Sequence, residues 1–433
     1  MYIRSATEVF REDRMDESGQ GFTDVTPFEE ARERFQRLCD PHERQETVPI
    51  QRGAGRTLAE SVHAPRDVPH YDRAAMDGYA VRAADTYGAS ERSPVRLTET
   101  ESPLDEGEAV PVHTGSPIPD GANAVVMIEH VEKRADGLSV FDALPEGENV
   151  APAGEDVQAG EELFEAGHRL APADLGLIRA TGIQELTVYE RPRVSVLPTG
   201  EELVSESPDA GEVVETNGLV VSSLVEQWGG AASYRDVVTD DEAALAAAIE
   251  GDADHDLVVT LGGSSVGDRD LVPAVVDDLG SIHVHGVAIQ PGHPVAFGTV
   301  SETPTLLLPG YPVSCLLTAV QFLRPAIAAR GGWQAPTHPT VSARLDSKLR
   351  SEPGTRTFAR IQLDTSGKQE TAADGDTEPE TGTRTAVPVR VSGAGVLSSV
   401  TAADGWVEIP EQREGIPAGE TVTVQLWDWV WRP

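Results

Sequence analysis

Lysine is almost absent from this sequence, and positive charge is scarce in general. The 433 residues include 34 lysines and arginines against 72 acidic residues, a formal net charge of -38, and the only lysines are Lys133, Lys348 and Lys368. Nucleic acids and anionic membranes are bound through basic patches, so this composition argues against both kinds of partner. An acidic, lysine-poor surface is typical of proteins adapted to high salt, where the screening length falls to about 3 Å at 1 M.

Cysteine and long apolar runs are also scarce. Cys39 and Cys315 lie far apart and outside any CxxC pattern, which excludes a disulfide scaffold and a cysteine-based zinc site. Residues 1–20 contain no apolar run of signal-peptide length, and no segment reaches the roughly 18 to 20 apolar residues of a membrane span. We therefore expect a cytoplasmic protein in a reducing compartment, with about three or four domains from its length.

The pattern of apolar residues changes along the chain. A helix is predicted over 26–38, with Thr26 as N-cap and Pro27 as its first residue. Residues 48–188 contain short alternating strands broken by many Gly and Pro turns, which is typical of β structure. From residue 193 to 329 apolar strands alternate with helices, which predicts a parallel sheet covered by helices on both faces. Strands return from residue 340, interrupted by an acidic stretch that we interpret as a mobile insertion at 365–385.

Three turns between strands and helices stand out in the region of the predicted parallel sheet. They are 199–203, 261–270 and 310–314, each directly after an apolar strand. The carboxyl ends of parallel strands meet at one sheet edge, where free backbone N–H groups bind anions. Glu201, Glu202, Asp268 and Asp270 would gather beside such an anion, an arrangement that favours a hard cation such as Mg²⁺ between them.

Other interpretations of the glycine-rich turn remain open on sequence alone. Residues 263–267 also fit the G-x-S-x-G nucleophile elbow of hydrolases, which would make Ser265 a nucleophile. The elbow requires a later histidine, and only His283, His285 and His293 precede the end of the sheet. A plain structural turn is a third interpretation. His283 and His285 alternate along one strand, as a metal-binding pair or as a solvent-facing pair.

Seven segments, in order, resemble the signatures of one known family. The sequence is similar to the MoeA family of molybdopterin molybdenumtransferases, which is related to the C-terminal domain of gephyrin, from about residue 25 to 427. The matching segments are AAMDGYAV (74–81), HTGSPIP (113–119), GEDV (154–157), TGEEL (199–203), LGGSSVGDRD (261–270), PGHPVAF (291–297) and LPGYPVS (308–314).

The resemblance implies a multidomain fold that combines α/β and all-β parts. A central doubly wound parallel or mixed sheet domain is expected at 191–332, with a C-terminal domain similar to a β-barrel at 337–433. The same resemblance implies an elongated, discontinuous N-terminal domain (24–65 and 145–190), an inserted β-rich AMDGYA domain (66–144) and a flexible extension at 1–23.

The activity that the resemblance implies is insertion of molybdate into adenylylated molybdopterin, with Mg²⁺ and release of AMP, in molybdenum cofactor biosynthesis. A homodimer is implied, with each active-site cleft shared between two subunits, and the molybdopterin adenylyltransferase is a further candidate partner. Matching positions give the expected catalytic residues Asp77, Thr114, Asp156, Asp240 and Asp270, and the expected metal ligands Glu202, Asp240 and Asp270. Expected substrate-binding residues are Thr199, Gly200, Gly262, Gly263, Ser264, Gly267, Gln290, His293, Pro309, Gly310, Pro312 and Ser398.

Several of these residues have structural alternatives. Asp77 is also suited to a turn before Gly78, Asp240 to the N-cap of the helix from Glu242, and Ser398 to a turn at a strand end. Each of the acids taken singly also fits a solvated surface of a protein adapted to high salt.

The sequence departs from the family pattern where positive charge is expected. Gln290 and His293 stand where the family usually has lysines, Tyr311 replaces an asparagine, and Ser264 replaces a valine. Glutamine carries no charge, and histidine is charged only in part near neutral pH. These changes favour a diverged paralogue, with tungstate in place of molybdate as one alternative. A molybdopterin-binding scaffold without catalysis is another.

Overall fold

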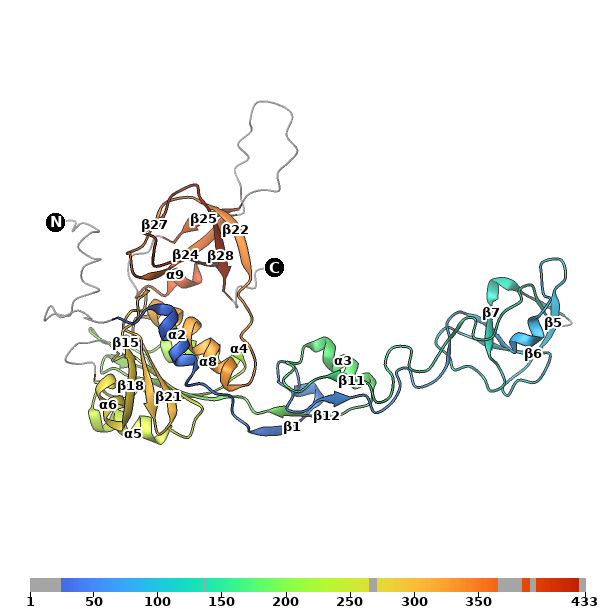
Figure 1. Ribbon diagram of the computed structural model, residues 1–433, viewed down its shortest axis with the longest axis horizontal. Coiled ribbons are helices and arrows are strands. Elements are labelled where there is room, and N and C mark those ends of the chain that lie inside the picture. The colour runs from blue at the N-terminus through green and yellow to red at the C-terminus, as the bar shows by residue number, and fades with distance from the viewer. Residues whose placement is uncertain (1–24, 136, 265–270, 365–383, 390–394, 428–433) are drawn as a thin grey trace, which may run out of the picture. The chain divides into compact units, whose positions relative to one another are not determined.

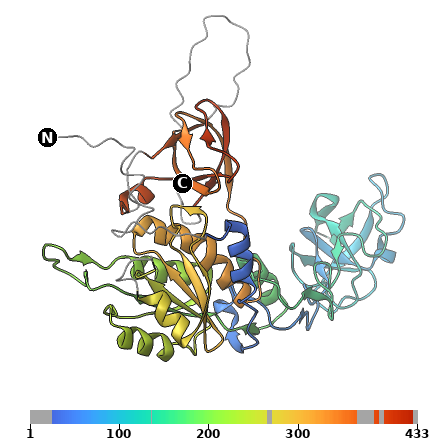
Figure 2. The same cartoon turned by 60° about the vertical axis from the view of Figure 1, so that its left-hand side comes forward.

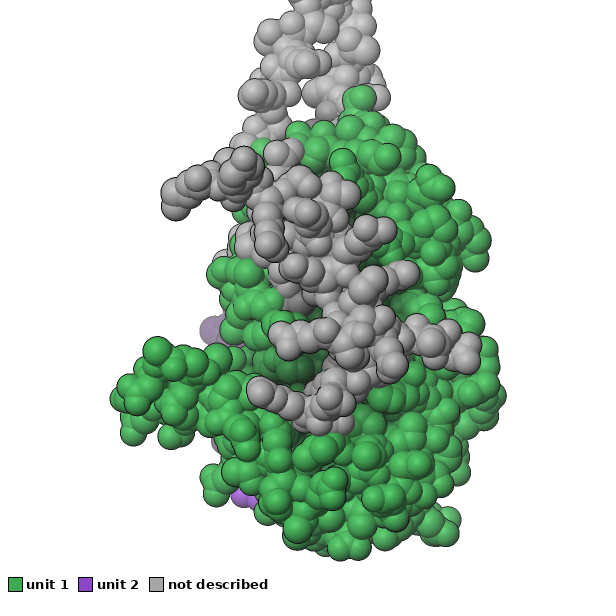
Figure 3. All heavy atoms as spheres, turned by 90° about the vertical axis from the view of Figure 1, so that its left-hand side faces the viewer, with its two compact units in different colours: residues 1–44, 189–433 green, residues 45–188 purple. Residues whose placement is uncertain are grey.

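The computed structural model describes residues 25–135, 137–264, 271–364, 384–389 and 395–427. The chain forms two compact units, which Figure 3 colours separately. Unit 1 contains residues 1–44 and 189–433, and unit 2 contains residues 45–188.

Unit 1 is built on a six-stranded mixed sheet with the order β16-β13-β17-β21-β20-β18 (Figure 1). Four neighbouring strands are parallel, and β20 runs antiparallel to them. The edge strand β18 pairs antiparallel with β20 and therefore runs in the same direction as the four. The bounds of the strands are β13 (Arg193–Pro198), β16 (Ala231–Tyr234), β17 (Leu257–Leu261), β18 (Gly280–His285), β20 (Ala296–Val300) and β21 (Thr303–Leu308). The mixed, doubly wound sheet confirms the predicted fold class.

Helices cover both faces of this sheet because its strands are apolar on both sides. Val194 and Val196 belong to one core cluster, and Leu197 and Val258 belong to another. The first face is covered by α2 (Phe28–Gln36), α4 (Asn217–Trp228), α7 (Pro312–Thr318) and α8 (Arg324–Arg330), and the second by α5 (Glu242–Gly251) and α6 (Val272–Leu279).

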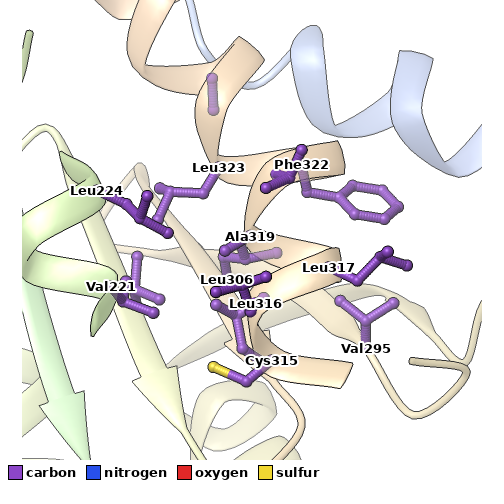
Figure 4. Packing of buried hydrophobic residues seen from close by; sticks show 14 of the residues in the cluster. Val221, Leu224, Val295, Leu306, Cys315, Leu316, Leu317, Ala319, Phe322 and Leu323 are labelled. Atoms are coloured by element: carbon purple, nitrogen blue, oxygen red, sulfur yellow. The ribbon is translucent and has the colours of Figure 1, made fainter. Parts of the chain in front are cut away.

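One continuous helical stretch forms the centre of the first face. A π-helical turn, η4 (Ala319–Leu323), joins α7 to α8. Figure 4 shows Leu316, Ala319 and Leu323 of this stretch close to Leu306 of β21 and Val221 and Leu224 of α4. By length and composition residues 312–330 would pass as a membrane span, contrary to the sequence criterion applied above. Because 78% of its most apolar window is buried inside the protein, the stretch is explained as a core helix.

The first helix begins later than its sequence predicts. Thr26 is part of an extended segment, where its N–H donates to Gly286 O at 3.0 Å and its carbonyl accepts from Ala288 N at 2.9 Å. Pairing with a strand-like segment therefore prevents Thr26 from capping, and Pro27 occupies the N-cap position of α2 without a side-chain hydrogen bond.

The C-terminal part of unit 1 is a closed five-stranded barrel (Figures 1 and 2). Its strands are β22 (Thr340–Leu345), β24 (Arg356–Asp364), β25 (Thr385–Pro388), β26 (Gly405–Ile409) and β28 (Thr421–Leu426), and pairing between β24 and β26 closes the ring. The strand β19 (Ile289–Gln290) belongs to the preceding α/β region and pairs with β24. Shorter elements are β23 (Leu349–Arg350), β27 (Gly415–Ile416) and α9 (Ser398–Thr401).

Unit 2 contains a second six-stranded sheet and a smaller set of paired strands. The sheet has the order β7-β4-β6-β5-β9-β8. Its strands are β4 (Gly78–Val81), β5 (Val95–Glu99), β6 (Glu108–Val112), β7 (Ala124–Met127), β8 (Val131–Arg134) and β9 (Gly137–Val140), with η2 (Ala83–Thr86) and η3 (Ile128–His130) beside them. The smaller part pairs β1 (Gln45–Pro49) with β12 (Glu185–Tyr189), β2 (Val62–His63) with β11 (Glu162–Phe164) and β3 (Arg73–Ala74) with β10 (Val150–Ala151), and includes η1 (Ile50–Arg52) and α3 (Pro172–Ala180).

Candidate functional site

The turns after β13, β17 and β21 meet at the carboxyl edge of the unit 1 sheet. Thr199 N donates to Leu261 O at 3.1 Å, and Gly262 N donates to Leu308 O at 3.0 Å. These bonds join three successive strand ends side by side, as predicted from the sequence. This edge is where ligands bind in open parallel sheets.

Glycines allow the three turns to approach within contact distance. Gly262 has a φ of +116°, and a Cβ there would lie 2.6 Å from Thr199 O. A Cβ on Gly310 would lie 3.5 Å from Gly262 Cα, so the third turn contacts the second. Only glycine fits the position of Gly262 without moving backbone atoms.

Thr199 presents an unpaired hydroxyl to this glycine floor. The residue is 2% exposed, and its Oγ1 has no hydrogen-bond partner within the described part of the chain. Its Oγ1 faces the two glycines that follow β17. It would lie 3.1 Å from a Cβ placed on Gly262 and 3.5 Å from one placed on Gly263. Leaving a buried hydroxyl without a partner costs about 1–3 kcal/mol, so a polar ligand on this floor would be stabilised by satisfying it.

The turn after β13 does not lead directly into a helix, in contrast to the sequence interpretation. It continues into an arm with the short parallel strands β14 (Leu203–Val204) and β15 (Val213–Val214), which extends from the sheet in Figure 2. The helix α4 then begins at Asn217, whose Nδ2 donates to Gly310 O at 2.7 Å. The N-terminus of α4 is thereby fixed beside the third turn.

Two of the three predicted metal ligands lie in described segments at this edge. The Glu202 side chain is exposed and folds back over Gly200, with both carboxylate oxygens 2.9 Å from the Cβ position of that glycine. The chain leading to Asp240 is bound to the same turn, because Gly200 N donates to Val238 O at 3.3 Å. Asp270 lies outside the described residues, as do Ser265, Gly267 and Asp268.

The alternative role of Asp240 as a helix cap is wrong. The N-cap of α5 is Asp241, whose Oδ1 accepts from Ala244 N at 2.9 Å. An N-cap must directly precede the first helical residue, Glu242, and only Asp241 satisfies this spacing. Within the described residues no three His, Cys, Asp or Glu side chains are grouped so as to hold a metal ion.

The two histidines of β18 have different neighbours, because a bulge between Ile282 and Val284 interrupts the expected alternation. His283 Nε2 lies 3.2 Å from Thr299 Oγ1. His285 Nε2 donates to the carbonyl of Ser264 at 3.1 Å, and Ser264 is 3% exposed. His285 therefore supports the glycine-rich turn from β18, the edge strand of the sheet.

The segment that lacks the expected lysines lies between α7 and the barrel. Gln290 pairs with Thr357 of β24. Gly292 has a φ of +115°, and a Cβ there would lie 2.4 Å from the Thr318 side chain. His293 accepts through its carbonyl from Val287 N at 2.9 Å. The backbone of this segment is thus tightly held. Positions 290 and 293, where the family usually has lysine, carry no permanent charge.

Arg360 is a functional candidate that sequence reasoning missed. It lies on β24, three residues beyond the partner of Gln290, and its partner on the adjacent antiparallel strand β26 is Trp406. Its Nε and the indole Nε1 of Trp406 are both buried without a hydrogen-bond partner among the described residues. Burial alone lowers the pKa of Arg360, with no described acid raising it, in a protein with an excess of acids. The residues around Arg360 in the sequence gave no signal of a function. Only the folded structure shows that no described acid lies beside its guanidinium group.

The remaining predicted residues of unit 1 lie at the beginning of short helices. Pro309 is buried, and Pro312 is the first residue of α7 after Tyr311. Ser398 is exposed at the start of the one-turn helix α9 rather than in a strand-end turn. The neighbouring Ser399 is fully buried, and its hydroxyl donates to Val396 O at 2.6 Å.

Unit 2 brings two of its three predicted catalytic residues into contact. Asp77 Oδ1 accepts from Thr114 N at 2.7 Å and from Thr114 Oγ1 at 2.8 Å. The backbone N–H and then the hydroxyl of Thr114 lower the pKa of Asp77, with a smaller contribution from His113. Both side chains are exposed, so Asp77 is an ionised carboxylate accessible to a ligand.

Asp156, the third predicted catalytic residue of unit 2, lies in the GEDV segment (154–157). Its N–H donates to Val68 O at 3.0 Å, and its side chain is exposed. Asp72 joins this segment to the AMDGYA segment, since its Oδ1 accepts from Ala153 N at 2.7 Å. A Cβ on Gly78 would lie 1.9 Å from Val126 O, which explains the glycine after Asp77.

Three family descriptions match successive parts of the chain. Residues 26–182 match the MoeA N-terminal region (domains I and II), residues 195–329 a probable molybdopterin-binding domain, and residues 342–427 the MoeA C-terminal region (domain IV). The strand-end turns described above all lie within the middle match.

Named relatives cover nearly the whole chain. The chain is 34% identical to molybdopterin molybdenumtransferase 2 of Mycobacterium tuberculosis over 414 residues, covering 90% of this chain and 96% of the relative. It is 33% identical to a putative molybdopterin biosynthesis protein of Methanocaldococcus jannaschii, covering 91% and 95%. The crystal structure of the molybdopterin biosynthesis MoeA protein from Pyrococcus horikoshii superimposes with a TM-score of 0.77 at 35% identity, covering 93% and 99%.

Fold and site together define a pterin-binding enzyme, a transferase of molybdenum cofactor biosynthesis. The chain belongs to the MoeA family of molybdopterin molybdenumtransferases.

Proposed function

We propose that the protein inserts molybdate into the dithiolene of adenylylated molybdopterin and releases AMP, with Mg²⁺ as the metal ion. The observation that carries this proposal is the floor formed by Thr199, Gly262 and Gly310, with its buried, unpaired hydroxyl. A phosphate or pterin group bound there would accept from that hydroxyl, which has no other partner among the described residues. The cytoplasm is the expected location, and the adenylyltransferase that makes the substrate is an expected partner.

The donor chemistry at this edge fits a magnesium ion held largely by substrate. Mg²⁺ is usually bound by one or two carboxylates together with phosphate oxygens and water. Glu202 and Asp240 are the described candidates, and Asp270 is the third proposed ligand. When bound, Mg²⁺ would neutralise phosphate charge beside these acids. Glu202 is the residue we expect to orient the phosphate, because its carboxylate already lies over the Gly200 turn.

Positive charge for the incoming oxyanion is proposed to come from Arg360. Gln290 and His293 supply none that is permanent, whereas Arg360 is a guanidinium with no described acidic partner. Thr357 pairs with Gln290, and three more residues of strand lead about 10 Å along β24 to Arg360. An oxyanion held by the Arg360 guanidinium would satisfy its buried Nε–H group.

Asp77, Thr114 and Asp156 are proposed to complete the site from a second subunit of a homodimer. Their exposed positions in unit 2 leave them available to a neighbouring molecule. Asp77 would act as an ionised acceptor for substrate N–H or hydroxyl groups, since its pKa is lowered by Thr114.

The central test measures AMP release by the purified protein at high salt and without oxygen. Adenylylated molybdopterin is supplied with molybdate or with tungstate, and the expected result is AMP release that depends on the oxyanion and on Mg²⁺. If the protein binds the pterin but releases no AMP with either oxyanion, the result would favour a non-catalytic scaffold, the alternative suggested by Gln290 and His293.

Arg360 has a separate test. Arg360→Ala is expected to raise the KM for molybdate by about tenfold or more, which corresponds to the loss of roughly 1.4 kcal/mol from a charge-assisted hydrogen bond. Arg360→Lys should retain part of the affinity, and Arg344→Ala, an exposed arginine of the same barrel, should have no effect. Adding Gln290→Lys and His293→Lys should restore molybdate affinity to Arg360→Ala. An unchanged KM in Arg360→Ala would remove the arginine from the site.

A further inference from the structure

An exposed aromatic ring stands directly beside the glycine floor. Tyr311 is 63% exposed, among the most exposed of the large apolar side chains in the described chain. It follows Gly310 in the third turn and is the N-cap residue of α7. A tyrosine combines a planar apolar ring with a polar hydroxyl, so an exposed ring offers a surface against which a ligand can pack.

The backbone around Tyr311 is held from three sides, so the ring projects from a fixed point. Its carbonyl accepts from Cys315 N at 2.8 Å, which begins α7. Asn217 holds the preceding Gly310 carbonyl at 2.7 Å. On the barrel side, a Cβ on Gly395 would lie 3.6 Å from Tyr311 Cδ1, so that glycine borders the edge of the ring.

The location of the ring matches the chemistry of the proposed substrate. Gly310 faces Gly262, since a Cβ on Gly310 would lie 3.5 Å from Gly262 Cα, so a ligand on the glycine floor would lie one residue away from Tyr311. Adenylylated molybdopterin carries two planar heterocycles, the pterin and the adenine. Stacking on an aromatic side chain stabilises a bound base without requiring hydrogen-bond partners.

We propose that Tyr311 is a stacking platform for a planar heterocycle of the substrate, which makes it a specificity-determining residue of this chain. This inference rests on the proposed function and extends it, because the sequence resemblance leads one to expect an asparagine at this position. An amide cannot provide the same ring surface. The protein would thereby gain substrate affinity from stacking at a site whose surroundings carry little positive charge.

The experiment titrates wild-type protein, Tyr311→Phe, Tyr311→Ala and Tyr311→Asn with adenylylated molybdopterin, and follows quenching of pterin fluorescence. Tyr311→Ala and Tyr311→Asn are expected to weaken binding about tenfold, and Tyr311→Phe should bind like wild type because the ring is kept. A parallel titration with AMP identifies the heterocycle: a similar loss for AMP assigns adenine, and a loss confined to the full substrate assigns the pterin. Tyr87→Ala, which removes a tyrosine that is 62% exposed in unit 2, is the control.

The outcomes separate this inference from the proposed function. If wild type does not bind the pterin nucleotide at all, the proposed function fails. If wild type binds and Tyr311→Ala binds equally well, or if Tyr311→Phe loses as much affinity as Tyr311→Ala, the stacking role is overturned. A change of oligomeric state in Tyr311→Ala, measured by size-exclusion chromatography, would instead identify the ring as a subunit contact and would also overturn it.

Discussion

Asp77 retains its charge at lower pH than an ordinary aspartate because Thr114 donates two hydrogen bonds to one of its oxygens. Thr114→Val removes the hydroxyl donor and keeps the backbone one. The pKa of Asp77 should then rise part of the way toward its ordinary value. If catalysis requires the carboxylate, the acid limb of the profile of kcat/KM against pH should move to higher pH. The profile is measured by AMP release.

Thr114→Ser provides the matched control for this prediction, since it keeps the hydroxyl and should leave the acid limb where it is. A profile of Thr114→Val that overlies the wild-type profile would mean that ionisation of Asp77 does not limit the reaction.

A single glycine is equally testable. Gly262→Ala would place a methyl group 2.6 Å from Thr199 O at a φ of +116°, so the first two turns must separate. We expect a loss of stability of about 1–3 kcal/mol and a larger loss of pterin binding, measured by urea unfolding and by titration. Gly176→Ala is the control, because Gly176 lies within α3 with open space around it, and it should stabilise by about 0.5–1 kcal/mol.

At the level of elements, β17 is anchored at both ends by different chemistry. Its carboxyl end carries the glycine floor. Before its first residue, the buried carboxylate of Asp256 accepts from Arg44 Nη1 at 2.9 Å and from Arg193 N at 2.7 Å. Burial raises the pKa of Asp256, but these hydrogen bonds outweigh it and the pKa is lowered.

Asp256→Asn should therefore destabilise unit 1. Breaking a buried ion pair typically costs about 3–5 kcal/mol, which urea unfolding at neutral pH would measure. Because the folded pKa is below the unfolded one, the carboxylate contributes its full stability above about pH 4, and the contribution is lost as pH falls through the folded value. The exposed neighbour variant Asp254→Asn should change stability by less than about 1 kcal/mol. Equal stability of the two variants would contradict this account.

Sequence patterns predicted the elements of unit 1 well where strands are continuous apolar runs. The convergence of three turns at one edge followed from strand and helix alternation alone, and the mixed sheet agreed with it. The π turn at Ala319 was not predicted, because it continues the apolar pattern of the helix. The arm between Val204 and Val213 was not predicted, because strands of two residues are too short to show an alternation. The shift of the first helix start arose from pairing of Thr26 with a distant segment, which local capping signals cannot reveal.

The candidate site was only partly accessible from the sequence. Thr199 and Gly262 could be named from their motifs, but the unpaired hydroxyl between them required the packed strand ends. Arg360 could not be identified, because the sequence does not show whether an arginine has an acidic partner in the fold. Family resemblance supplied residues such as Asp77, whose contact with Thr114 spans 37 positions in the chain.

At the level of the whole molecule, a shared cleft predicts complementation between two impaired variants, assayed at a molybdate concentration well below the wild-type KM. Asp77→Ala affects unit 2, and Arg360→Ala affects unit 1. When the two proteins are mixed and allowed to exchange subunits, each heterodimer would contain one intact site and one doubly altered site. About a quarter of wild-type AMP release should return, because about half the dimers are mixed and each has one of two sites.

Each variant alone and a mixture kept below the exchange temperature serve as controls. Activity of the mixture that stays at the level of the separate variants, with exchange verified by mass spectrometry, would contradict a site built from two subunits.

The pairing of β19 with β24 has a consequence for modularity. Two residues of the α/β region, Ile289 and Gln290, are a hydrogen-bonded neighbour of the barrel, and Phe28, Phe358 and Trp406 share one apolar core. A chain ending after α8 would leave this strand unpaired and these rings exposed. The barrel therefore cannot be exchanged as an independent domain. A chimaera of two relatives must take the Ile289–Gln290 strand and the barrel from the same protein.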